Sequence, residues 1–345
     1  MLSKKLFLVL ILTFTLSMFM LGCDDDDNGS GDTVDETALL LAAGDAYFGS
    51  YLTTAGESPN ISITELYGLL TDTDTTNDPY LLDFRSESDF NAGHINGAVH
   101  MSLSELPDAV DTLPTDKTIV TICYMGQTAS HAAAFINLIA QDPDYSGLHA
   151  RNLLFGMSAV GTPSGPYIQN WVNTIATDEW VDQLETTPHT ATQTYDLPTI
   201  NTGENTLAEI LKARWTEYLT SNGNWANLTN TADVFVNNSN YFIINYWPQS
   251  EYENPGHIPG AYCFPPKTSI QSDADLNKLP LDQDIIVYCY TGQTSAQLAA
   301  YLRLLGYKAW SLAWGVNGFA YHALDGIGHQ YSPPVDDHSA ILWTP

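Results

Sequence analysis

Two cysteines lie in nearly the same short motif, 166 residues apart (289 minus 123). The first motif is Cys-Tyr-Met-Gly-Gln-Thr-Ala at 123–129, and the second is Cys-Tyr-Thr-Gly-Gln-Thr-Ser at 289–295. Each follows a β-rich run and precedes an Ala-rich run that favours helix, so each thiol is expected where a strand turns into a helix. There, backbone amides and the positive helix end stabilise a thiolate without a basic side chain. The pattern predicts a cysteine nucleophile or a sulfur carrier.

The helix dipole supplies only part of this stabilisation. It contributes up to ~2 kcal/mol in a partly buried geometry, which lowers a cysteine pKa by at most about 1.5 units from its ordinary value near 8.5. Hydrogen bonds from amides must supply the rest.

Other landmarks repeat at a similar spacing. The turn Gly-His-Ile-Asn-Gly-Ala at 93–98 recurs as Gly-His-Ile-Pro-Gly-Ala at 256–261, and Tyr-Leu-Thr at 51–53 recurs at 218–220. Landmarks in the same order at nearly one offset indicate two copies of one structural unit. We expect the units at 36–176 and 205–345, joined by a Thr-rich linker at 177–204.

Strand and helix patterns alternate within each unit. Ser62 and Glu65 form a capping-box pattern that opens a helix through Leu70, and a second helix is expected at 104–113. The expected strands are Tyr80–Phe84, Ala98–Met101 and Thr118–Ile122 in the first unit and Tyr241–Asn245, Ala261–Phe264 and Ile285–Tyr288 in the second. This alternation predicts the α/β class, with a mainly parallel sheet in each unit and helices on both faces.

Motifs outside the loops resemble those of a known family. They are Leu82-Asp83-Phe84-Arg85, Phe90, the 93–98 turn and Leu154-Phe155-Gly156 in the first unit, and Tyr252, the 256–261 turn and Ala313-Trp314-Gly315 in the second. Together with the loops, they make the chain from residue 36 onward resemble a tandem rhodanese-type sulfurtransferase. The resemblance implies two rhodanese-like domains. It also implies transfer of sulfane sulfur through persulfides on Cys123 and Cys289, from thiosulfate, mercaptopyruvate or polysulfide to cyanide or a thiol.

The same resemblance assigns the site residues. Substrate binding falls to the loops, at Tyr124, Met125, Gly126, Gln127, Thr128 and Ala129 and at Tyr290, Thr291, Gly292, Gln293, Thr294 and Ser295. Asp83, Arg85, His94 and His257 are expected to support the sites, with the two histidines bonding the turn beside each loop rather than transferring protons.

Two further residues are interpreted from the sequence. His131, just past the first loop, is expected either on a helix surface, the favoured interpretation, or in contact with substrate. Cys263 aligns with His100 and is either a small buried residue or a thiol close enough to Cys289 to resolve a persulfide.

Some positions depart from the family's pattern. Many members have Arg directly after the cysteine or later in the loop, where it helps to bind an anionic donor, whereas this chain has Tyr and then Gln in both loops. Thiosulfate is therefore not the expected preferred donor. Phosphatases of similar fold need a longer loop ending in Arg, and neither loop contains Arg or Lys, so phosphatase activity is disfavoured. Asp83 and Arg85 become Asn245 and Trp247 in the second unit, so the two sites are not expected to be equivalent.

Composition excludes other functions. The chain has 345 residues and a formal net charge of −29, with 11 basic residues against 40 acidic ones. Such a surface cannot neutralise nucleic-acid phosphates, so no nucleic-acid partner is expected. No metal-ligand set or phosphate-binding Gly-rich loop is recognisable, and we expect no cofactor and no metal.

The N-terminus indicates export. Lys4 and Lys5 precede an apolar stretch from Leu6 to Leu21, shorter than a membrane span and typical of a signal peptide. Gly22 and Cys23 follow, an arrangement that resembles the lipobox of bacterial lipoproteins. It implies a signal peptide at 1–22, a lipid anchor on Cys23, an acidic tether at 23–35 and a place in the bacterial cell envelope.

Lipidation of Cys23 would leave an odd number of cysteines, so at least one thiol should be free. Cleavage would leave 9 basic and 40 acidic residues, a net charge of −31.

Two functions from different classes fit these patterns. The first is an envelope sulfurtransferase that acts through both cysteines. The second is a module that accepts polysulfide or persulfide and delivers it with little turnover of free donors. A purely structural rhodanese-like interaction domain is a third interpretation. The membrane, through the lipid anchor, and a small sulfur donor and acceptor are the expected partners.

Overall fold

The computed structural model describes residues 34–161, 167–175, 178–220, 227–228, 230–333 and 335–343. The expected signal peptide, Cys23 and residues 23–33 of the tether lie outside this range. The last tether residue, Asp35, belongs to the first helix, because its carboxylate accepts a hydrogen bond from the Ala38 amide at 2.9 Å. Within the described part of the chain, no helix combines the length and the apolar character needed to cross a membrane.

The first unit is built on a five-stranded parallel sheet. Its strands lie in the order β1 (Asn60–Ile61), β6 (Ala150–Leu153), β5 (Ile119–Ile122), β2 (Tyr80–Asp83) and β4 (Val99–His100). All neighbours run parallel. The residues of β5 and β6 are all buried, as expected of a parallel sheet covered on both faces.

The second unit repeats this sheet. Its order is β7 (Asn227–Leu228), β11 (Ala309–Leu312), β10 (Asp284–Tyr288), β8 (Tyr241–Asn245) and β9 (Tyr262–Cys263), again with parallel neighbours throughout. The two α/β units predicted from the repeats, each with a mainly parallel sheet, are therefore confirmed.

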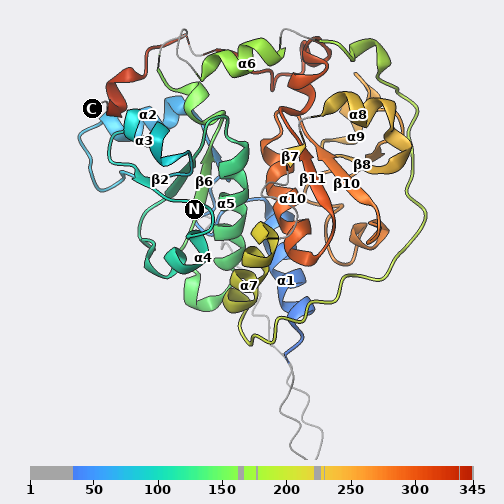
Figure 1. The fold of residues 1–345 in the computed structure, drawn as a ribbon, viewed down its shortest axis with the longest axis horizontal. Helices are drawn as coiled ribbons and strands as arrows, with labels where there is room; N and C mark the ends of the chain where they lie inside the picture. The colour runs from blue at the N-terminus through green and yellow to red at the C-terminus, as the bar shows by residue number, and fades with distance from the viewer. Residues whose placement is uncertain are drawn as a thin grey trace, which may run out of the picture. The chain divides into compact units, whose positions relative to one another are not determined.

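A further pair of strands crosses the predicted domain boundary. Strand β12 (Leu342–Trp343) pairs antiparallel with β3 (His94–Ile95) of the first unit, and Figure 1 shows the red C-terminal end of the chain beside α2. The buried Ile341 joins the core of the first unit with Ile61 and Leu66. The assignment of 205–345 to a single second domain is thus corrected, since the C-terminal end completes the first unit.

The helix expected to open at Ser62 begins at Ile63, and the helix expected at 104–113 is a shorter α-helix at Leu106–Ala109 followed by a 3₁₀ turn. The helices are α1 (Glu36–Ser50), α2 (Ile63–Thr71), α3 (Glu87–Ala92), α4 (Leu106–Ala109), α5 (Gln127–Ile139), α6 (Ile168–Ile175), α7 (Leu207–Thr220), α8 (Thr231–Val236), α9 (Gln249–Glu253) and α10 (Gln293–Leu305). Short 3₁₀ segments lie at Val110–Thr112, Pro143–Tyr145, Gly156–Ala159, Val181–Gln183, Asn238–Asn240, Leu276–Lys278, Gly315–Gly318, Tyr321–Leu324 and Ser339–Ile341. As predicted, the Ser62 hydroxyl caps α2 by accepting from the Glu65 amide at 3.1 Å.

The helices that follow the two cysteines pack against each other. Figure 1 shows α5 and α10 side by side between the sheets, and their buried faces belong to one hydrophobic core shared by both units. Helix α1 contacts both of them. The contact with α10 is close, because a Cβ on Gly44 would lie 2.0 Å from Cζ of Tyr301.

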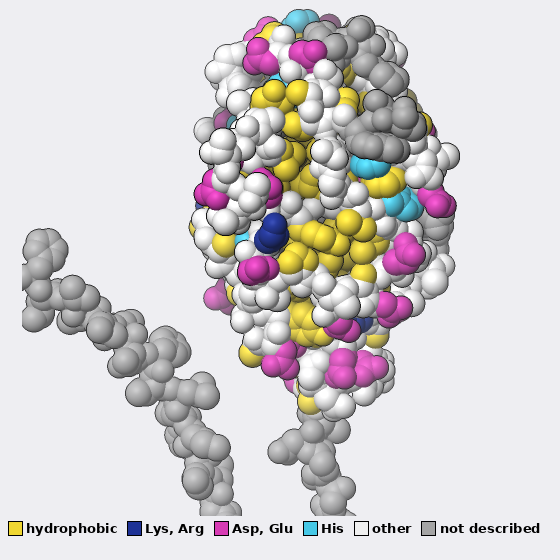
Figure 2. Space-filling model, turned by 90° about the vertical axis from the view of Figure 1, so that its left-hand side faces the viewer, with side chains coloured by type: hydrophobic (Ala, Val, Ile, Leu, Met, Phe, Trp, Pro, Cys, Tyr) yellow, Lys and Arg dark blue, Asp and Glu magenta, His cyan; other side chains and the backbone are white. Residues whose placement is uncertain are grey.

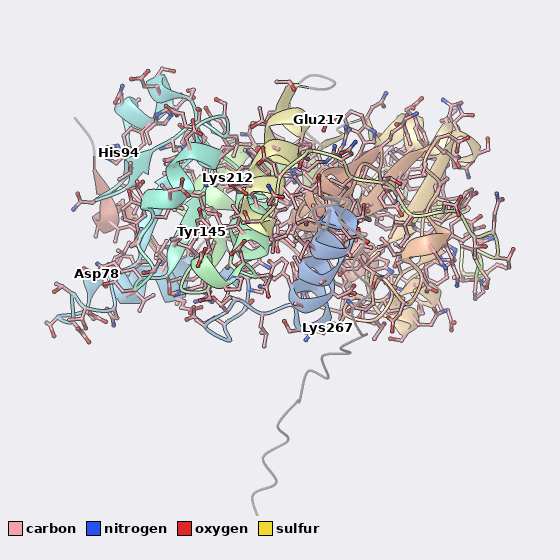
Figure 3. The ribbon with its side chains drawn as sticks, turned by 90° about the horizontal axis from the view of Figure 1, so that it is seen from below. Asp78, His94, Tyr145, Lys212, Glu217 and Lys267 are labelled. Carbon is pink, nitrogen blue, oxygen red and sulfur yellow. The ribbon has the colours of Figure 1, made fainter. Side chains whose placement is uncertain are left out.

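Helix α7 covers the first unit although it opens the second. The Trp215 indole donates to the Leu103 carbonyl at 2.9 Å. Lys212 bonds the Asp111 carboxylate at 2.5 Å and the Tyr145 hydroxyl at 3.2 Å. Lys212 and Tyr145 are labelled in Figure 3. The helix preceding each sheet therefore packs against the other unit, which joins the two units into one packed body.

The surface reflects the acidic composition. On the face drawn in Figure 2, acidic side chains clearly outnumber basic ones and surround areas of hydrophobic side chains. The few cations of the described chain are largely engaged, as in the pair between Arg151 and Glu65 at 2.6 Å.

Candidate functional site

The first cysteine lies in a tight buried loop between β5 and α5. Cys123 is 2% exposed, and its sulfur accepts a hydrogen bond from the Gly126 amide at 3.1 Å. Its carbonyl accepts from the Met157 amide at 2.8 Å. Gly156 makes this approach possible, since a Cβ there would lie 2.2 Å from the Cys123 carbonyl oxygen. The loop thus holds the sulfur against a backbone amide, as the sequence pattern predicts.

The helix after each loop starts directly after a glycine. Gly126 and Gly292, with φ of 83° and 77°, are the N-caps, and neither cap is made by a side chain. A left-handed turn at glycine lets each of these helices begin directly after it.

Burial dominates the ionisation of the first thiol. Desolvation raises the pKa of Cys123, while the amides of Ala129, Met125 and Gly126 lower it and the charge of Asp83 raises it further; the net shift is upward. This direction is opposite to the one expected from the helix dipole. The reason is that a thiolate with 2% exposure loses more solvation than the surrounding amides replace.

The second cysteine has a different immediate partner. Cys289 is also 2% exposed, and its sulfur lies 3.4 Å from both the amide and the hydroxyl of Ser295. The Ser295 hydroxyl in turn lies 2.9 Å from that of Ser311. The first loop has Ala129 at the position of Ser295, so only the second sulfur has a hydroxyl beside it from this position. All three described cysteines are free thiols.

In both loops, the tyrosine after the cysteine is bonded to a carboxylate. The Tyr124 hydroxyl donates to Asp89 of α3, and the Tyr290 hydroxyl donates to Glu251 of α9. Burial, followed by the neighbouring carboxylate, raises the pKa of both phenols. The residue after the cysteine, which is Arg in many members of the family that the sequence resembles, is therefore a tyrosine bonded to an acid at each site.

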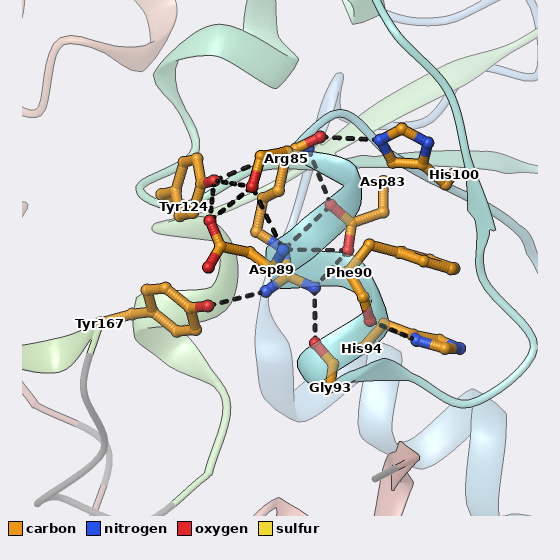
Figure 4. Close-up of polar contacts among 10 residues, drawn as sticks. Asp83, Arg85, Asp89, Phe90, Gly93, His94, His100, Tyr124 and Tyr167 are labelled. Atoms are coloured by element: carbon orange, nitrogen blue, oxygen red, sulfur yellow. Dashed lines mark hydrogen bonds and ion pairs between the residues drawn. The ribbon is translucent and has the colours of Figure 1, made fainter. Parts of the chain in front are cut away.

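Asp83 and Arg85 form a buried ion pair in the first unit (Figure 4). The guanidinium bonds both carboxylate oxygens at 2.7–3.0 Å, the Gly93 carbonyl at 2.8 Å and the Tyr167 hydroxyl at 3.1 Å. Its nitrogens are thus engaged with the protein, and the pair fixes the end of β2 to the turn that follows α3.

The second unit has a neutral arrangement at these positions. The Asn245 amide donates to the Tyr288 hydroxyl at 2.8 Å, and the Trp247 ring lies 5.0 Å from that of Tyr290. The structural difference between the two sites, expected from these substitutions, is confirmed.

A cavity of about 580 Å³ lies beside the first loop. Tyr124 and Thr128 of the loop line it together with Phe84, and Leu219 and Thr220 close it from the end of α7. The cavity beside Tyr124 and Thr128 of the first loop is therefore built by both units. The repeated Tyr-Leu-Thr motif at 218–220 supplies part of this wall.

The matching motif at 51–53 lies at the second site. The Tyr51 hydroxyl donates to Gln297 of α10 at 2.9 Å, and burial together with the charge of Cys289 raises the pKa of Tyr51. At the first site, Tyr218 of α7 lies 3.3 Å from His131, which occupies the position equivalent to Gln297. His131 is fully buried, so its expected place on a helix surface was wrong.

The two loop glutamines cross between the units. Gln293 is fully buried, and its carbonyl oxygen accepts from the Phe155 amide at 2.9 Å and the Asn152 amide at 3.1 Å. Gln127 is 3% exposed and donates to the Thr291 carbonyl at 3.3 Å. The resemblance assigned both side chains to substrate binding. In the structure, each glutamine instead bonds residues of the other unit. The partly exposed loop positions are Tyr124, Met125, Thr128, Tyr290, Thr291 and Thr294.

The two turn histidines hold the backbone beside the loops. Nδ1 of His94 lies 2.9 Å from the Phe90 carbonyl, and its ring stacks on Phe90 at 3.8 Å. Nδ1 of His257 lies 2.8 Å from the Tyr252 carbonyl, with the rings stacked at 3.6 Å. Burial lowers the pKa of His257. These contacts agree with the predicted structural role.

Two features outside the loops remain. The Cys263 sulfur lies 3.9 Å from the Trp247 carbonyl, and burial raises its thiol pKa to about 11; its persulfide-resolving role stays a prediction. The structure also gathers Glu185, His189 and His257, whose ligand atoms all lie within 4.8 Å of one another. The sequence search missed this group, because the only local signal is a Glu and a His four residues apart.

Comparison with known proteins places these features in a family. The sequence profile of the rhodanese-like domain matches residues 62–160 and 231–322. A thiosulfate sulfurtransferase of Tolumonas auensis is 30% identical over 66 residues, which cover 19% of this chain and 62% of that protein. A putative sulfurtransferase of Bacillus subtilis is 30% identical over 80 residues, which cover 23% of this chain and 71% of that protein. The structure of a rhodanese-like domain protein of Staphylococcus aureus is 18% identical, and its alignment covers 28% of this chain and 86% of that protein's chain with a TM-score of 0.24.

Proposed function

Since the chain belongs to the rhodanese-like domain family, with two such domains, we propose that it is a sulfurtransferase that carries sulfane sulfur as a persulfide on Cys123 and Cys289. The observation that supports this most strongly is the first loop. It places the Cys123 sulfur 3.1 Å from the Gly126 amide, beside a cavity of about 580 Å³. The match with the sulfurtransferase of Tolumonas auensis covers less than two thirds of that protein, so the activity proposed here depends on this site.

The reaction conserves atoms and electrons in two displacements. In the first, the Cys123 thiolate attacks the outer sulfur of the donor, a new S–S bond forms, and the donor's own bond to that sulfur breaks. The electron pair leaves with the rest of the donor. In the second, the thiolate or cyanide acceptor attacks the outer sulfur of the persulfide, and the Cys123 thiolate leaves. The cysteine thus ends in its starting state.

The loop geometry favours the second displacement, in which the Cys123 thiolate leaves. Burial raises the pKa of the Cys123 thiol, so the proton must leave as the donor binds. Once sulfur has been added, we expect the terminal sulfur to extend from the buried Cys123 atom toward the partly exposed loop residues Tyr124 and Thr128. The amide of Gly126 stays with the inner sulfur, which becomes the leaving thiolate in the second step.

The charges at the site bear on the donor. Arg85 is bound to Asp83 and to neighbouring oxygens, and the Tyr124 hydroxyl is bonded to Asp89. A dianionic donor such as thiosulfate would meet these acids without a free basic group from the loop. We therefore propose persulfides or polysulfides of low charge as the preferred donors and a thiol as the acceptor.

A carrier with little turnover is the second candidate. The observation in its favour is that both nucleophilic sulfurs are 2% exposed, since a buried persulfide is protected from bulk thiols. Intact-mass measurement after exposure to polysulfide separates the two proposals. A stable added mass of one sulfur without turnover of any free donor supports the carrier.

The transferase proposal is tested with single cysteine variants. Cys123→Ser, Cys289→Ser and Cys263→Ser are assayed with a panel of donors, using cyanide and small thiols as acceptors. We expect Cys123→Ser to lose most of the turnover and Cys289→Ser to lose a smaller part. Cys263→Ser is assayed beside them: it keeps the wild-type rate if Cys263 is only a small buried residue, whereas slower release of sulfur from Cys289 would mark Cys263 as a resolving thiol. Wild-type turnover in both Cys123→Ser and Cys289→Ser, on every donor, would overturn the proposal.

We also propose that the protein works in the bacterial cell envelope, anchored through a lipid on Cys23. The signal-like stretch from Leu6 to Leu21 directly before Gly22 and Cys23 supports this. In cells fed labelled fatty acid, the full-length chain should become labelled and a Cys23→Ser variant should not. Equal labelling of the two would contradict the anchor.

A further inference from the structure

The linker meets the second unit at a group of three side chains. Glu185 and His257 form an isolated antiparallel bridge, in which each backbone amide donates to the other residue's carbonyl at 2.8–2.9 Å. His189 lies four residues after Glu185 in the chain, and its amide donates to the Tyr252 hydroxyl at 2.9 Å. Backbone contacts therefore hold the three side chains together independently of any bond between the side chains themselves.

His257 presents an unused nitrogen to this group. Its Nδ1 lies 2.8 Å from the Tyr252 carbonyl, which can only accept, so in the neutral ring the proton is on Nδ1 and Nε2 carries a lone pair. Nε2 is buried and has no hydrogen-bond partner among the described residues, in a side chain with no solvent exposure. It lies 3.4 Å from Oε1 of Glu185. Two electron-rich atoms thus face each other, an arrangement that a cation between them would stabilise.

We propose that Glu185, His189 and His257 bind a divalent transition-metal ion, with zinc as the best fit. Two imidazole nitrogens and one carboxylate are a common zinc ligand set, whereas calcium and magnesium prefer oxygen ligands throughout. The carbonyl of Tyr252 orients the His257 ring from behind, as outer-shell acceptors do for metal-binding histidines.

The spacing of the ligand atoms suits this ion. Zinc bonds of about 2.0–2.1 Å at a tetrahedral angle separate neighbouring ligand atoms by about 3.3 Å. The 3.4 Å between His257 and Glu185 matches this edge. His189 Nε2 lies 2.6 Å from the same carboxylate oxygen, and a small rotation of this half-exposed side chain opens that distance. The fourth position is left to water, since Glu185 and His189 are 31% and 38% exposed.

The ion would fasten the linker to the second unit. Glu185 and His189 lie in the connection between the two sheets, and His257 lies in the turn that leads into β9. The site is separate in its chemistry from the sulfur-carrying loops, because its ligands are two imidazoles and a carboxylate and include none of the thiols.

Zinc binding to tag-free protein, measured by calorimetry and by metal analysis after dialysis, tests the proposal. The wild type should bind one zinc per chain. His189→Gln should weaken binding by at least about 100-fold, since loss of an outer-shell partner alone typically costs about 10–100-fold. His322→Gln is the matched control, because its ring is exposed and its one ion pair within the described part of the chain is with Asp325. It should bind zinc as the wild type does.

Cobalt distinguishes this site from the thiols. Cobalt-loaded protein should show the visible bands of a four-coordinate nitrogen and oxygen site without sulfur-to-metal charge transfer, and Cys263→Ser should leave the spectrum unchanged. His257→Gln should also lose the metal, but its ring is buried, so the half-exposed His189 carries the test if that variant does not fold. Equal zinc affinity in the wild type and His189→Gln, or a charge-transfer band from sulfur, would overturn the proposal.

Discussion

Gly156→Ala should lower the free energy of unfolding by more than a glycine-to-alanine change at an uncrowded site does, because it disturbs the first cysteine loop. The new Cβ would lie 2.2 Å from the Cys123 carbonyl oxygen and 2.8 Å from the Gly126 amide nitrogen, both backbone atoms that cannot rotate away. Gly156 has φ of 53°, and a side chain in this region costs about 1–2 kcal/mol. Overpacking adds about 1–3 kcal/mol. We expect a total loss of about 2–5 kcal/mol, measured from urea unfolding.

Gly97→Ala provides the matched control. Gly97 has φ of 83°, but a Cβ there meets nothing within 4 Å, so this variant should lose only the backbone cost of about 1–2 kcal/mol. Sulfur transfer gives a second readout. Gly156→Ala should slow transfer through Cys123, whereas Gly315→Ala, whose Cβ would lie 2.2 Å from the Cys289 carbonyl oxygen, should slow transfer through Cys289. Equal destabilisation in Gly97→Ala and Gly156→Ala, with unchanged transfer in both, would refute the reasoning.

Three other changes test the site. Arg85→Met leaves the Asp83 carboxylate buried without its partner and should cost about 3–5 kcal/mol in urea unfolding; a loss below about 1 kcal/mol would contradict the role of the pair. Burial raises the pKa of Cys123. The rate of alkylation of this thiol, followed by mass spectrometry, should therefore keep rising above about pH 8.5, where an ordinary cysteine is half ionised. A rate that levels off below about pH 8 would be inconsistent with this shift. In a Cys289→Ser background, Thr220→Trp should fill the cavity beside the first loop and slow turnover; an unchanged rate would show that substrate does not use this cavity.

Local patterns predicted the elements and the reactive cysteines. The Ser62 cap, the strand at Tyr241–Asn245 and the cysteine at the end of β5 depend on residues close together in the chain, so their signals are visible in the sequence. The repeat also revealed that the second site would differ, since Asn245 replaces Asp83 at a matching position.

Contacts between the units had no such signal. Gln293 reaches Phe155, a separation of 138 residues, and the sequence alone assigned it to substrate. His131 is buried because helix α7 covers it, which no periodicity within α5 reveals. The group of Glu185, His189 and His257 likewise depends on a bridge between the linker and a turn of the second unit. Residues that look like loop or surface positions in one unit become interior when the other unit is added.

The pairing of β12 with β3 has a consequence for the order of folding. The Ile341 carbonyl accepts from the Asn96 amide at 2.7 Å, and the Ile341 side chain is 5% exposed within the core of the first unit. A chain that is made or threaded across a membrane from its N-terminus therefore cannot complete its first unit until its last residues have emerged. Helix α7 adds to this delay, because Leu219 and Thr220, which line the cavity beside the first loop, are synthesised only after the first sheet. A competent first site thus marks a chain that has been delivered almost to its end, so truncated chains would lack it even though they contain the cysteine.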